Sequence, residues 1–394
     1  MTSDRLPATK SGVHVKIDLR YGCNPHQGQA AVSHTAAPLS VLNGTASYIN
    51  LLDALGAWQL VRELSQATGK ASAASFKHVS PAGAAIAGDL SDEFIASQFL
   101  RNADLSDVAN AYVRARGGDR MCSFGDAAAV SEVVDESLAN LLGSEVSDLL
   151  IAPGFEPAAL EILKKKKKGG YLLLQIDPGY EAPALESREV FGFTFTQERN
   201  HEPFTRAIFG DIPERAADSL LVASIALKYT QSNSIAVACD GQVIGVGAGQ
   251  QSRIHCTRLA CDKADKWMLQ SHPKVLELPF QKGTRKVDKA NIVDQFLLWD
   301  ELSDRERSDL GAQLDGTPDP LTAAEREAWV KDYHPVVLAS DAFIPFRDNI
   351  DRAARSNVRY VAHTGGSVRD DDVATAASEY GMVTVATGIR AFLH

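Results

Sequence analysis

Cysteine is scarce in this sequence, and neither a secretory leader nor a long apolar run is present. Five cysteines occur among 394 residues, and no two have the CxxC spacing. A chain of this length buries a sufficient core without disulfides, so we expect free thiols and a reducing compartment. The polar first residues and the strand-length apolar runs argue against a signal peptide and a membrane span. These absences predict a soluble cytoplasmic protein with no membrane partner.

Positive charge is in deficit, because the formal net charge is −10. A generally basic surface for nucleic acid is therefore not expected, and any phosphate must be held by a few well-placed cations. Hydrophobic residues make up 45% and charged residues 23%, which is typical of a packed globular protein. The length predicts two domains of about 100–200 residues each.

Several well-known catalytic motifs are missing, including the Walker loop, HExxH and a Ser-His-Asp context. Gly245–Gly249 resembles a dinucleotide loop, but Gln250 occupies the sixth position and a predicted hairpin precedes it. A zinc deaminase is excluded because His78-Val-Ser80 lacks the glutamate of H-x-E and no P-C-x-x-C occurs. We therefore expect no catalytic metal and no metal-ligand cluster.

Short β-branched runs alternate with alanine- and leucine-rich stretches, which is typical of an α/β protein. We expect a helix over 51–67 and a strand over 71–76 that ends at Lys77-His78. Ser80–Gly83 is expected to form a turn, and a further helix can begin at Ala84. Lys77-His78 is thus placed at a strand end, where α/β sheets commonly carry their chemistry.

The second half follows the same logic. Asp240-Gly241 joins two apolar runs and predicts a hairpin of strands 235–239 and 242–246. The other elements predicted in this half are helices over 220–229, 254–268 and 350–355 and strands over 336–340 and 360–362.

A faint internal echo suggests two similar halves. Ser123–Asp126 and Ala339–Asp341 both follow an apolar run and precede a helical pattern. The stretch 180–213 is rich in Pro, Glu and Arg, so we place the boundary there. The predicted domains are 1–195 and 196–394, the second with a helical insertion at about 282–330.

Lys164–Lys168 is a run of five lysines followed by two glycines. Such a run can be an anion-binding loop or a solvated helix end, where cations suit the helix dipole. We favour the helix end, because mutual repulsion makes the run a poor preorganised site.

Lys77-His78 is the best candidate for a catalytic centre. A histidine accepts a proton near neutral pH, and an adjacent lysine stabilises negative charge and keeps the imidazole neutral. The alternative is an ordinary surface pair. The Ser-Pro-Ala-Gly sequence that follows favours the catalytic interpretation, because it would hold the pair at a fixed sheet edge.

Three further arginines are candidate anion ligands. Arg20 and Tyr21 suit a phosphate clamp, and a loop tied down by its own hydrogen bonds is an equally good interpretation. Arg253 follows a glycine-rich turn and precedes a predicted helix, where anions commonly bind. Arg390 lies near the C-terminus and requires an ordered tail to contribute.

At these residues the sequence resembles a known family, the bifunctional purine enzymes that formylate AICAR and then cyclise the product to IMP. The resemblance covers the transformylase portion and runs from about Leu19 to His394. The blocks that carry it, in order, are Leu19–Gln27, Ser75–Gly83, Lys228–Ser234, Gly245–Ala260 and Ser340–Asp348.

The resemblance implies roles for individual residues. His78 would take the proton from the attacking amine, and Lys77 would stabilise the oxyanion on the formyl carbon. The residues matching the AICAR site are Arg20, Tyr21, Asn50, Gly154, Asp177, Asn233, Arg253, Phe343 and Arg390. Those on the folate side, which binds 10-formyltetrahydrofolate as co-substrate, are Ile254, Asp348, Ser367 and Val368.

The resemblance also implies a fold of two tandem cytidine-deaminase-like α/β/α domains with a small helical insertion. It further implies a homodimer whose active sites are shared between subunits. Only nineteen residues precede Arg20, so we expect no IMP cyclohydrolase activity and a dependence on a separate cyclohydrolase. The alternative is that this chain is a piece of a longer protein.

Two other functions stay open. The same pocket could belong to a catalytically silent protein that senses AICAR or a related monophosphate, although the intact Lys77-His78 pair argues against this. The same fold could also serve another aminoimidazole acceptor or another donor such as formyl phosphate, although no ATP-binding motif supports that.

Overall fold

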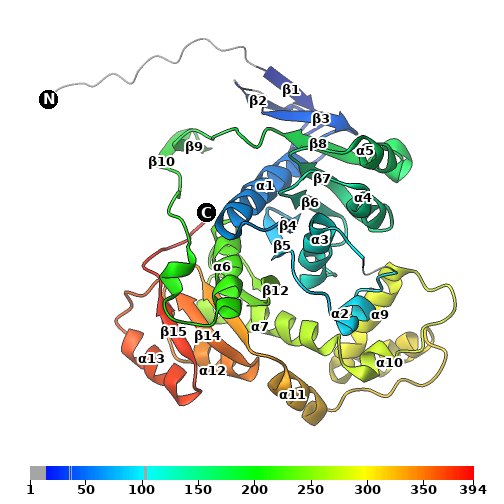
Figure 1. The fold of residues 1–394 in the computed structure, drawn as a ribbon, viewed down its shortest axis with the longest axis vertical. Coiled ribbons are helices and arrows are strands. Elements are labelled where there is room, and N and C mark those ends of the chain that lie inside the picture. The colour runs from blue at the N-terminus through cyan, green and yellow to red at the C-terminus, as the bar shows by residue number, and fades with distance from the viewer. Residues whose placement is uncertain (1–14, 35, 37, 102–103) are drawn as a thin grey trace.

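A single long β-sheet runs through the molecule (Figure 1). The computed structural model describes residues 15–34, 36, 38–101 and 104–394. Within these residues the sheet has eleven strands in the order β15-β14-β13-β11-β12-β5-β4-β6-β7-β8-β3. The strands are β3 (Leu39–Asn43), β4 (Ser72–Lys77), β5 (Ser80–Ile86), β6 (Asp126–Val130), β7 (Ser147–Ala152), β8 (Leu172–Ile176), β11 (Ile235–Cys239), β12 (Gln242–Gly247), β13 (Val336–Ser340), β14 (Val358–His363) and β15 (Val383–Ala386).

Helices cover both faces of this sheet. One face packs against α1 (Tyr48–Thr68) and α6 (Glu214–Lys228) through a continuous apolar core. The opposite face packs against α3 (Asp107–Gly118), α4 (Glu136–Gly143), α5 (Pro157–Lys164), α7 (Arg253–Leu269), α12 (Asp348–Arg355) and α13 (Asp370–Glu379). Successive residues of a strand point to opposite faces of the sheet, so Ala73 contributes to one core and Ala74 to the other. The protein is therefore an α/β protein with three layers, as the sequence predicts.

The two halves of the sheet repeat one order of elements. The first half is α1-β4-β5-α3-β6-α4-β7-α5-β8, and the second is α6-β11-β12-α7-β13-α12-β14-α13-β15. Antiparallel pairing of β12 with β5 joins the two halves. The echo between Asp126 and Asp341 was not between equivalent positions, because Asp126 opens β6 whereas Asp341 follows β13. The likeness to deaminase domains and the boundary at 195 stay predictions.

Most elements predicted from the sequence are confirmed, including the β11–β12 hairpin and helices α1, α6, α7 and α12. The turn at Ser80–Gly83 and the helix from Ala84 are wrong, because these residues form β5. Pro81 is tolerated in the strand beside a register shift between Ser75 and Phe76 of β4. Gly83 marks a close approach, since a Cβ there would lie 2.1 Å from the carbonyl oxygen of Ala115 in α3.

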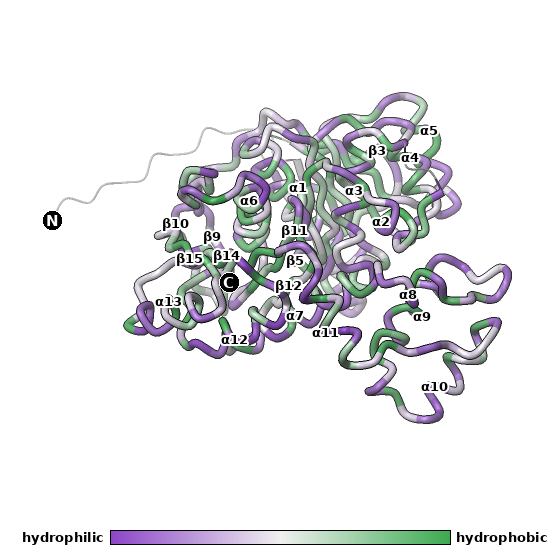
Figure 2. Tube along the Cα trace, turned by 60° about the horizontal axis from the view of Figure 1, so that its bottom comes forward, coloured by the Kyte–Doolittle hydropathy of each residue, from purple (hydrophilic) through white to green (hydrophobic). Residues whose placement is uncertain are grey.

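The remaining elements lie outside the sheet. Figure 2 shows the predicted insertion extending from the main body. The additional elements are β1 (Val15–Leu19), β2 (Ala30–His34), α2 (Asp92–Ser97), η1 (Lys166–Gly169), β9 (Leu185–Val190), β10 (Phe193–Glu198), η2 (Arg206–Phe209), α8 (Pro273–Leu276), α9 (Lys286–Leu297), η3 (Trp299–Glu301), α10 (Asp304–Gly311) and α11 (Ala323–Asp332). None of the helices in the described part of the chain is long and apolar enough to cross a membrane.

The lysine run lies at the end of a helix, which is the interpretation that the sequence favours. Lys164 ends α5 and pairs with Glu161 at 2.9 Å. Lys167 forms an ion pair with Asp148, and Lys166 donates to a carbonyl oxygen of the loop before β7. These cations are therefore engaged by neighbouring groups of the protein.

The glycines of β12 explain the sequence that imitates a dinucleotide loop. A Cβ on Gly245 would lie 2.2 Å from the carbonyl oxygen of Ala260, and one on Gly247 would lie 2.2 Å from that of Cys256. Helix α7 therefore packs directly on the backbone of β12.

We expect Gly245→Ala to destabilise the protein by about 2–3 kcal/mol, because strand and helix must separate to admit the methyl group. Gly143→Ala is the matched control, because its Cβ would meet nothing within 4 Å and the residue lies in α4. Urea denaturation of both variants tests this prediction. Equal stability of the two would contradict the close packing of α7 on β12.

Candidate active site

Lys77 and His78 lie at the β4–β5 turn. Lys77 pairs with Ser80, so His78 and Val79 form the two-residue connection. Both have positive φ, 54° and 61°. This backbone region is unusual for any residue other than glycine and strained for a β-branched one. Strain of this kind concentrates at functional sites, where surrounding contacts maintain it.

The turn is anchored by Asp53 of α1. Its Oδ1 accepts a hydrogen bond from the Val79 backbone N–H at 2.6 Å, and the residue is only 6% exposed. Burial raises the pKa of the Asp53 carboxyl, while the Val79 hydrogen bond and the nearby His78 and Lys77 charges act against this rise. Asp53 therefore couples the first turns of α1 to the position of His78.

Lys77 is held from the other side. Its ammonium donates to the carbonyl oxygen of Phe124, in the loop before β6. A buried network fixes this loop, since the neighbouring Ser123 accepts from Ser75 at 2.8 Å and its carbonyl accepts from Arg116 at 2.6 Å. Arg116 also forms an ion pair with Asp126 at 3.1 Å. These contacts hold the Lys77 ammonium at the strand end, next in the chain to the exposed His78.

A second polar cluster surrounds Asn233, which precedes β11. Arg253, 6% exposed, donates to the Asn233 side chain at 3.0 Å and to the Ser234 carbonyl at 2.9 Å. It also forms an ion pair with the buried Asp341. The Arg253 guanidinium, expected to bind an anion, is therefore committed to a carboxylate of the same chain. Its position makes it an anchor for Asn233.

The C-terminal tail is ordered against this cluster, as a contribution from Arg390 requires. The Leu393 carbonyl accepts from the Ser232 N–H at 3.0 Å, and the Ala391 N–H donates to the Asp341 carbonyl at 2.8 Å. The exposed Arg390 side chain lies over the Phe392 ring, with 4.9 Å from guanidinium carbon to ring centroid. It borders a cavity of about 480 Å³.

The predicted folate-side residues lie in the first turns of two helices and in the loop after β14. Asp348 begins α12, and Ile254 lies in the first turn of α7. Ser367 and Val368 follow β14, and the Val368 side chain is fully exposed. Phe343, assigned to the nucleotide, is 45% exposed in the loop after β13.

The sheet register divides the predicted residues between two edges. One, the Lys77 edge, is formed by the end of β4, the end of β12 and the start of β11, with Lys77, His78 and Asn233. The opposite one, the Gly154 edge, is formed by the ends of β7 and β8, followed by Gly154 and Asp177. Strands of five or six residues separate the edges by roughly 16–20 Å.

The other predicted AICAR residues lie near the start of the chain. Asn50 accepts a hydrogen bond from Ser47 at 2.7 Å and lies one turn before Asp53, near the Lys77 edge. Arg20 and Tyr21 follow β1, with the guanidinium 5.8 Å from the Tyr21 ring centroid. Their loop is closed by its own bonds, such as Gly22 N–H to the Gln27 carbonyl at 2.9 Å. This favours the self-bonded interpretation of the loop and leaves the Arg20 side chain exposed.

Sequence reasoning missed the residues that anchor the candidate site. Phe124 and Asp341 contact the predicted Lys77 and Arg253. Asp53 contacts the backbone of Val79, the neighbour of the predicted His78. A signal existed for Asp53, an acidic residue between the buried Leu51 and Ala54 of an apolar helix. Phe124 acts through its carbonyl oxygen, which no side-chain pattern reveals.

Comparison with known proteins identifies the family of this chain. Residues 2–263 match the family described as AICARFT/IMPCHase bienzyme. The bifunctional purine biosynthesis protein PurH of Roseobacter denitrificans is 31% identical over 95% of this chain and 59% of its own length. PurH of Synechococcus elongatus is 29% identical over 100% of this chain and 61% of its own length. The chain thus spans about three fifths of these relatives, and it belongs to the AICARFT/IMPCHase bienzyme family.

Proposed function

We propose that this chain transfers the formyl group of 10-formyltetrahydrofolate to the 5-amino group of AICAR, giving FAICAR and tetrahydrofolate. The observation that carries the proposal is the strained turn that presents Lys77 and His78 between Asp53 and Phe124. Membership of the family supports it, because both relatives are named bifunctional purine biosynthesis proteins. The proposed activity is formyl transfer without cyclisation, so a separate IMP cyclohydrolase would consume FAICAR.

The residue types fit the difficulty of the reaction. The amine of AICAR is conjugated to a ring bearing a carboxamide, so it is a weak nucleophile. As its nitrogen bonds to the formyl carbon, His78 accepts the amine proton and Lys77 stabilises the oxyanion. Collapse then breaks the bond from the formyl carbon to N10 of the folate, and His78 returns the proton to that nitrogen. No step requires a metal.

The nucleotide and the folate would bind along the Lys77 edge. Asn233 and His78 lie there three strand positions apart, roughly 14 Å, which a nucleotide can span. Arg390 supplies an exposed cation for the phosphate, and Arg253 holds the Asn233 side chain in place. The exposed Phe343 and Val368 offer apolar surface on the folate side.

A homodimer would complete the site. Gly154 and Asp177 lie on the Gly154 edge of the same chain, too far from His78 to touch one substrate. A second copy would bring its own Gly154 edge to the Lys77 edge of the first. This split of the predicted residues supports active sites shared between two subunits.

The β9–β10 hairpin is the surface we propose for contact with the second copy. Among the described residues its two strands pair only with each other, and it exposes Phe191, Phe193 and Phe195 by 97%, 68% and 62%. Phe191 is at φ 51° in the turn, a strained backbone conformation for a residue with a bulky side chain. Its ring is nevertheless almost fully exposed. An isolated two-stranded ribbon is marginally stable in water, and burial of these rings would stabilise it.

We expect His78→Ala to lower kcat about 10²–10⁴-fold and Lys77→Ala about 10²–10³-fold, with AICAR affinity largely retained. The reason is that both groups act on charge that develops in the transition state. The measurement follows tetrahydrofolate, FAICAR and IMP separately. Unchanged turnover in His78→Ala would disprove its role as the base.

The same assay on the wild-type protein separates the alternatives. FAICAR without IMP supports transformylation alone, whereas IMP from the purified chain would contradict the absence of cyclisation. Binding of AICAR without folate-dependent turnover would favour the catalytically silent protein that senses AICAR. Turnover with formyl phosphate but not with the folate would show that formyl phosphate is the donor.

Asp53 should act as a positioning residue. We expect Asp53→Ala to lower kcat roughly tenfold to a hundredfold, because the Val79 N–H loses its acceptor and His78 is released. Asp53→Asn retains an acceptor oxygen and should restore most of this activity. Equal losses of kcat in the two variants would show that the carboxylate charge, rather than the hydrogen bond, matters.

The dimer contact can be tested without weakening the hairpin. Asn tolerates positive φ, so Phe191→Asn removes the ring while relieving the turn. We expect the dissociation constant of the dimer to rise at least fivefold, as for an aromatic contact worth about 1 kcal/mol or more. Val146→Ser, at an exposed apolar residue away from the hairpin, is the control. Sedimentation that shows an unchanged dimer, or a fully active monomer, would contradict the proposal.

A further inference from the structure

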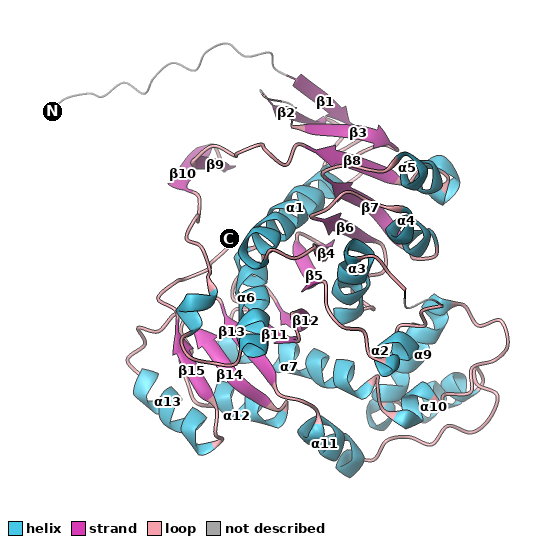
Figure 3. Cartoon of the chain, in the orientation of Figure 1, coloured by secondary structure: helices cyan, strands magenta, loops and turns pink. Residues whose placement is uncertain are grey.

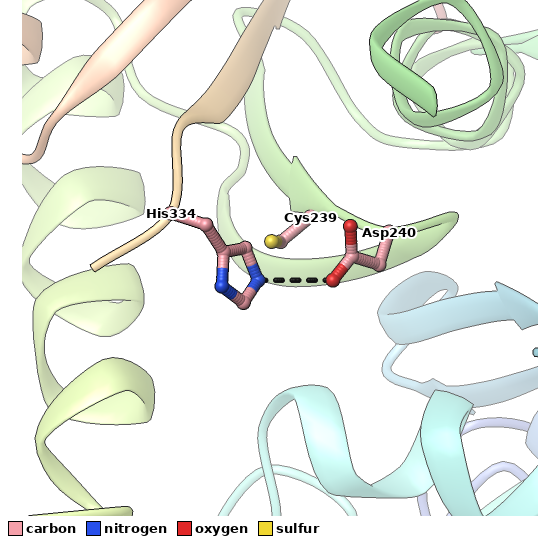
Figure 4. A group of neighbouring side chains, drawn as sticks. All are labelled: Cys239, Asp240 and His334. Atoms are coloured by element: carbon pink, nitrogen blue, oxygen red, sulfur yellow. Dashed lines mark ion pairs between the residues drawn. The ribbon is translucent and has the colours of Figure 1, made fainter. Parts of the chain in front are cut away.

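Three potential metal ligands meet at the β11–β12 turn, at the opposite edge of the sheet from Lys77. Figure 4 shows the side chains of Cys239, Asp240 and His334 gathered at this turn. One ligand atom from each lies within 4.8 Å of the other two. Cys239 ends β11, Asp240 opens the turn, and His334 comes from the segment between α11 and β13. It is the one such group of three within the described residues.

The carboxylate of Asp240 is already oriented for a ligand. Arg215 forms an ion pair with its Oδ1, and Oδ2 lies 2.9 Å from Nε2 of His334. One oxygen is therefore fixed by an outer partner and the other faces the histidine, as carboxylates in metal sites commonly are.

The other two ligands are held just as firmly. The backbone of Cys239 pairs with Gln242 across the hairpin, and the residue is 2% exposed. The His334 ring lies 4.4 Å from the Tyr333 ring, at 31°. The Tyr333 carbonyl accepts a hydrogen bond from Asn357 at 2.5 Å, which fixes this segment to the end of the α12–β14 connection. The His334 side chain is about half exposed, so an ion can enter from its side.

We propose that Cys239, Asp240 and His334 form a binding site for one zinc ion. Sulfur, nitrogen and carboxylate oxygen are the ligands that Zn²⁺ prefers, and bonds of about 2.0–2.3 Å in a tetrahedron place ligand atoms roughly 3.3–3.7 Å apart. Shifts of about 1 Å would bring the three side chains to that geometry. A water molecule would take the fourth position on the open side at His334.

Binding would exchange protons for the metal. The thiol of Cys239 loses its proton to solvent, and a neutral His334 binds through the nitrogen that now faces Asp240. Arg215 opposes a cation, but its side chain is 71% exposed and it contacts the other carboxylate oxygen, so water screens its charge.

The location assigns the ion a structural role. The β11–β12 turn lies on the Gly154 edge, whereas Lys77 lies on the opposite one. A zinc ion there would tie the hairpin to the segment that enters β13. It would lie four strand positions, roughly 19 Å, from the end of β7 that precedes Gly154. Zinc that binds only the native state would stabilise it by an amount that rises with the logarithm of zinc concentration over the dissociation constant.

The test uses the full chain, reduced and stripped of metal, titrated with Co²⁺ and then with Zn²⁺. A thiolate ligand gives Co²⁺ an intense near-ultraviolet charge-transfer band, which zinc should abolish by displacement. We expect one zinc per chain by equilibrium dialysis and a rise in melting temperature on its addition. Cys239→Ser should remove the band, and His334→Gln should weaken zinc binding at least tenfold.

Two controls keep the outcome decisive. Cys122→Ser alters a partly buried thiol outside the proposed site and should keep both the band and the melting shift. His334 is half exposed, so His334→Gln tests the site even if Cys239→Ser does not fold. A band that persists in Cys239→Ser, or zinc binding unchanged in His334→Gln, would overturn the proposal. No stoichiometric zinc binding to the wild-type chain would overturn it as well.

Discussion

The joint between β5 and β12 determines the relative position of everything else. Two hairpins from distant parts of the chain meet there, with the Ile86 N–H donating to the Gly241 carbonyl at 3.0 Å. The buried Arg114 of α3 donates to the carbonyl oxygens of both Ile86 and Asp240, which links the two hairpins through one side chain. Burial lowers the pKa of Arg114 to about 10, so it remains charged at neutral pH. Because this joint sets the register, it places the Lys77 turn and the Asn233 loop on the same edge.

The three hairpin turns share a backbone with positive φ but differ in how well their residues suit it. In the second half, Asp240-Gly241 occupies the two-residue turn, with residues suited to positive φ. The equivalent turn of the first half contains His78-Val79, and the β9–β10 turn contains Phe191-Gly192. A valine and a phenylalanine at positive φ each cost of order 1–3 kcal/mol. At Val79 the Asp53 hydrogen bond and the sheet compensate this cost, and what is presented is the catalytic candidate His78.

Glycine and proline were the least reliable signals in the sequence. Figure 3 shows β5 as a strand next to α3, where the composition of Ser80–Gly83 indicated a turn. Gly83 and Gly245 are both required because a helix backbone approaches a strand, not because the chain reverses there. Asp240-Gly241, by contrast, is a correct turn signal, since a strand-length apolar run lies on each side of it. Local composition cannot distinguish the two uses of glycine, because the approaching helix comes from elsewhere in the chain.

The sequence by itself determined the α/β class, the principal helices and strands, and the family through its motif blocks. These are local properties, because periodicity and short motifs are encoded by neighbouring residues. Only the tertiary structure decided that Arg253 binds Asp341, that Asp53 anchors the His78 turn, and that Gly154 and His78 lie on opposite edges of one sheet. It also brought His334 to Cys239 and Asp240. Such pairings depend on strand order and register, which are set by packing between segments far apart in the chain.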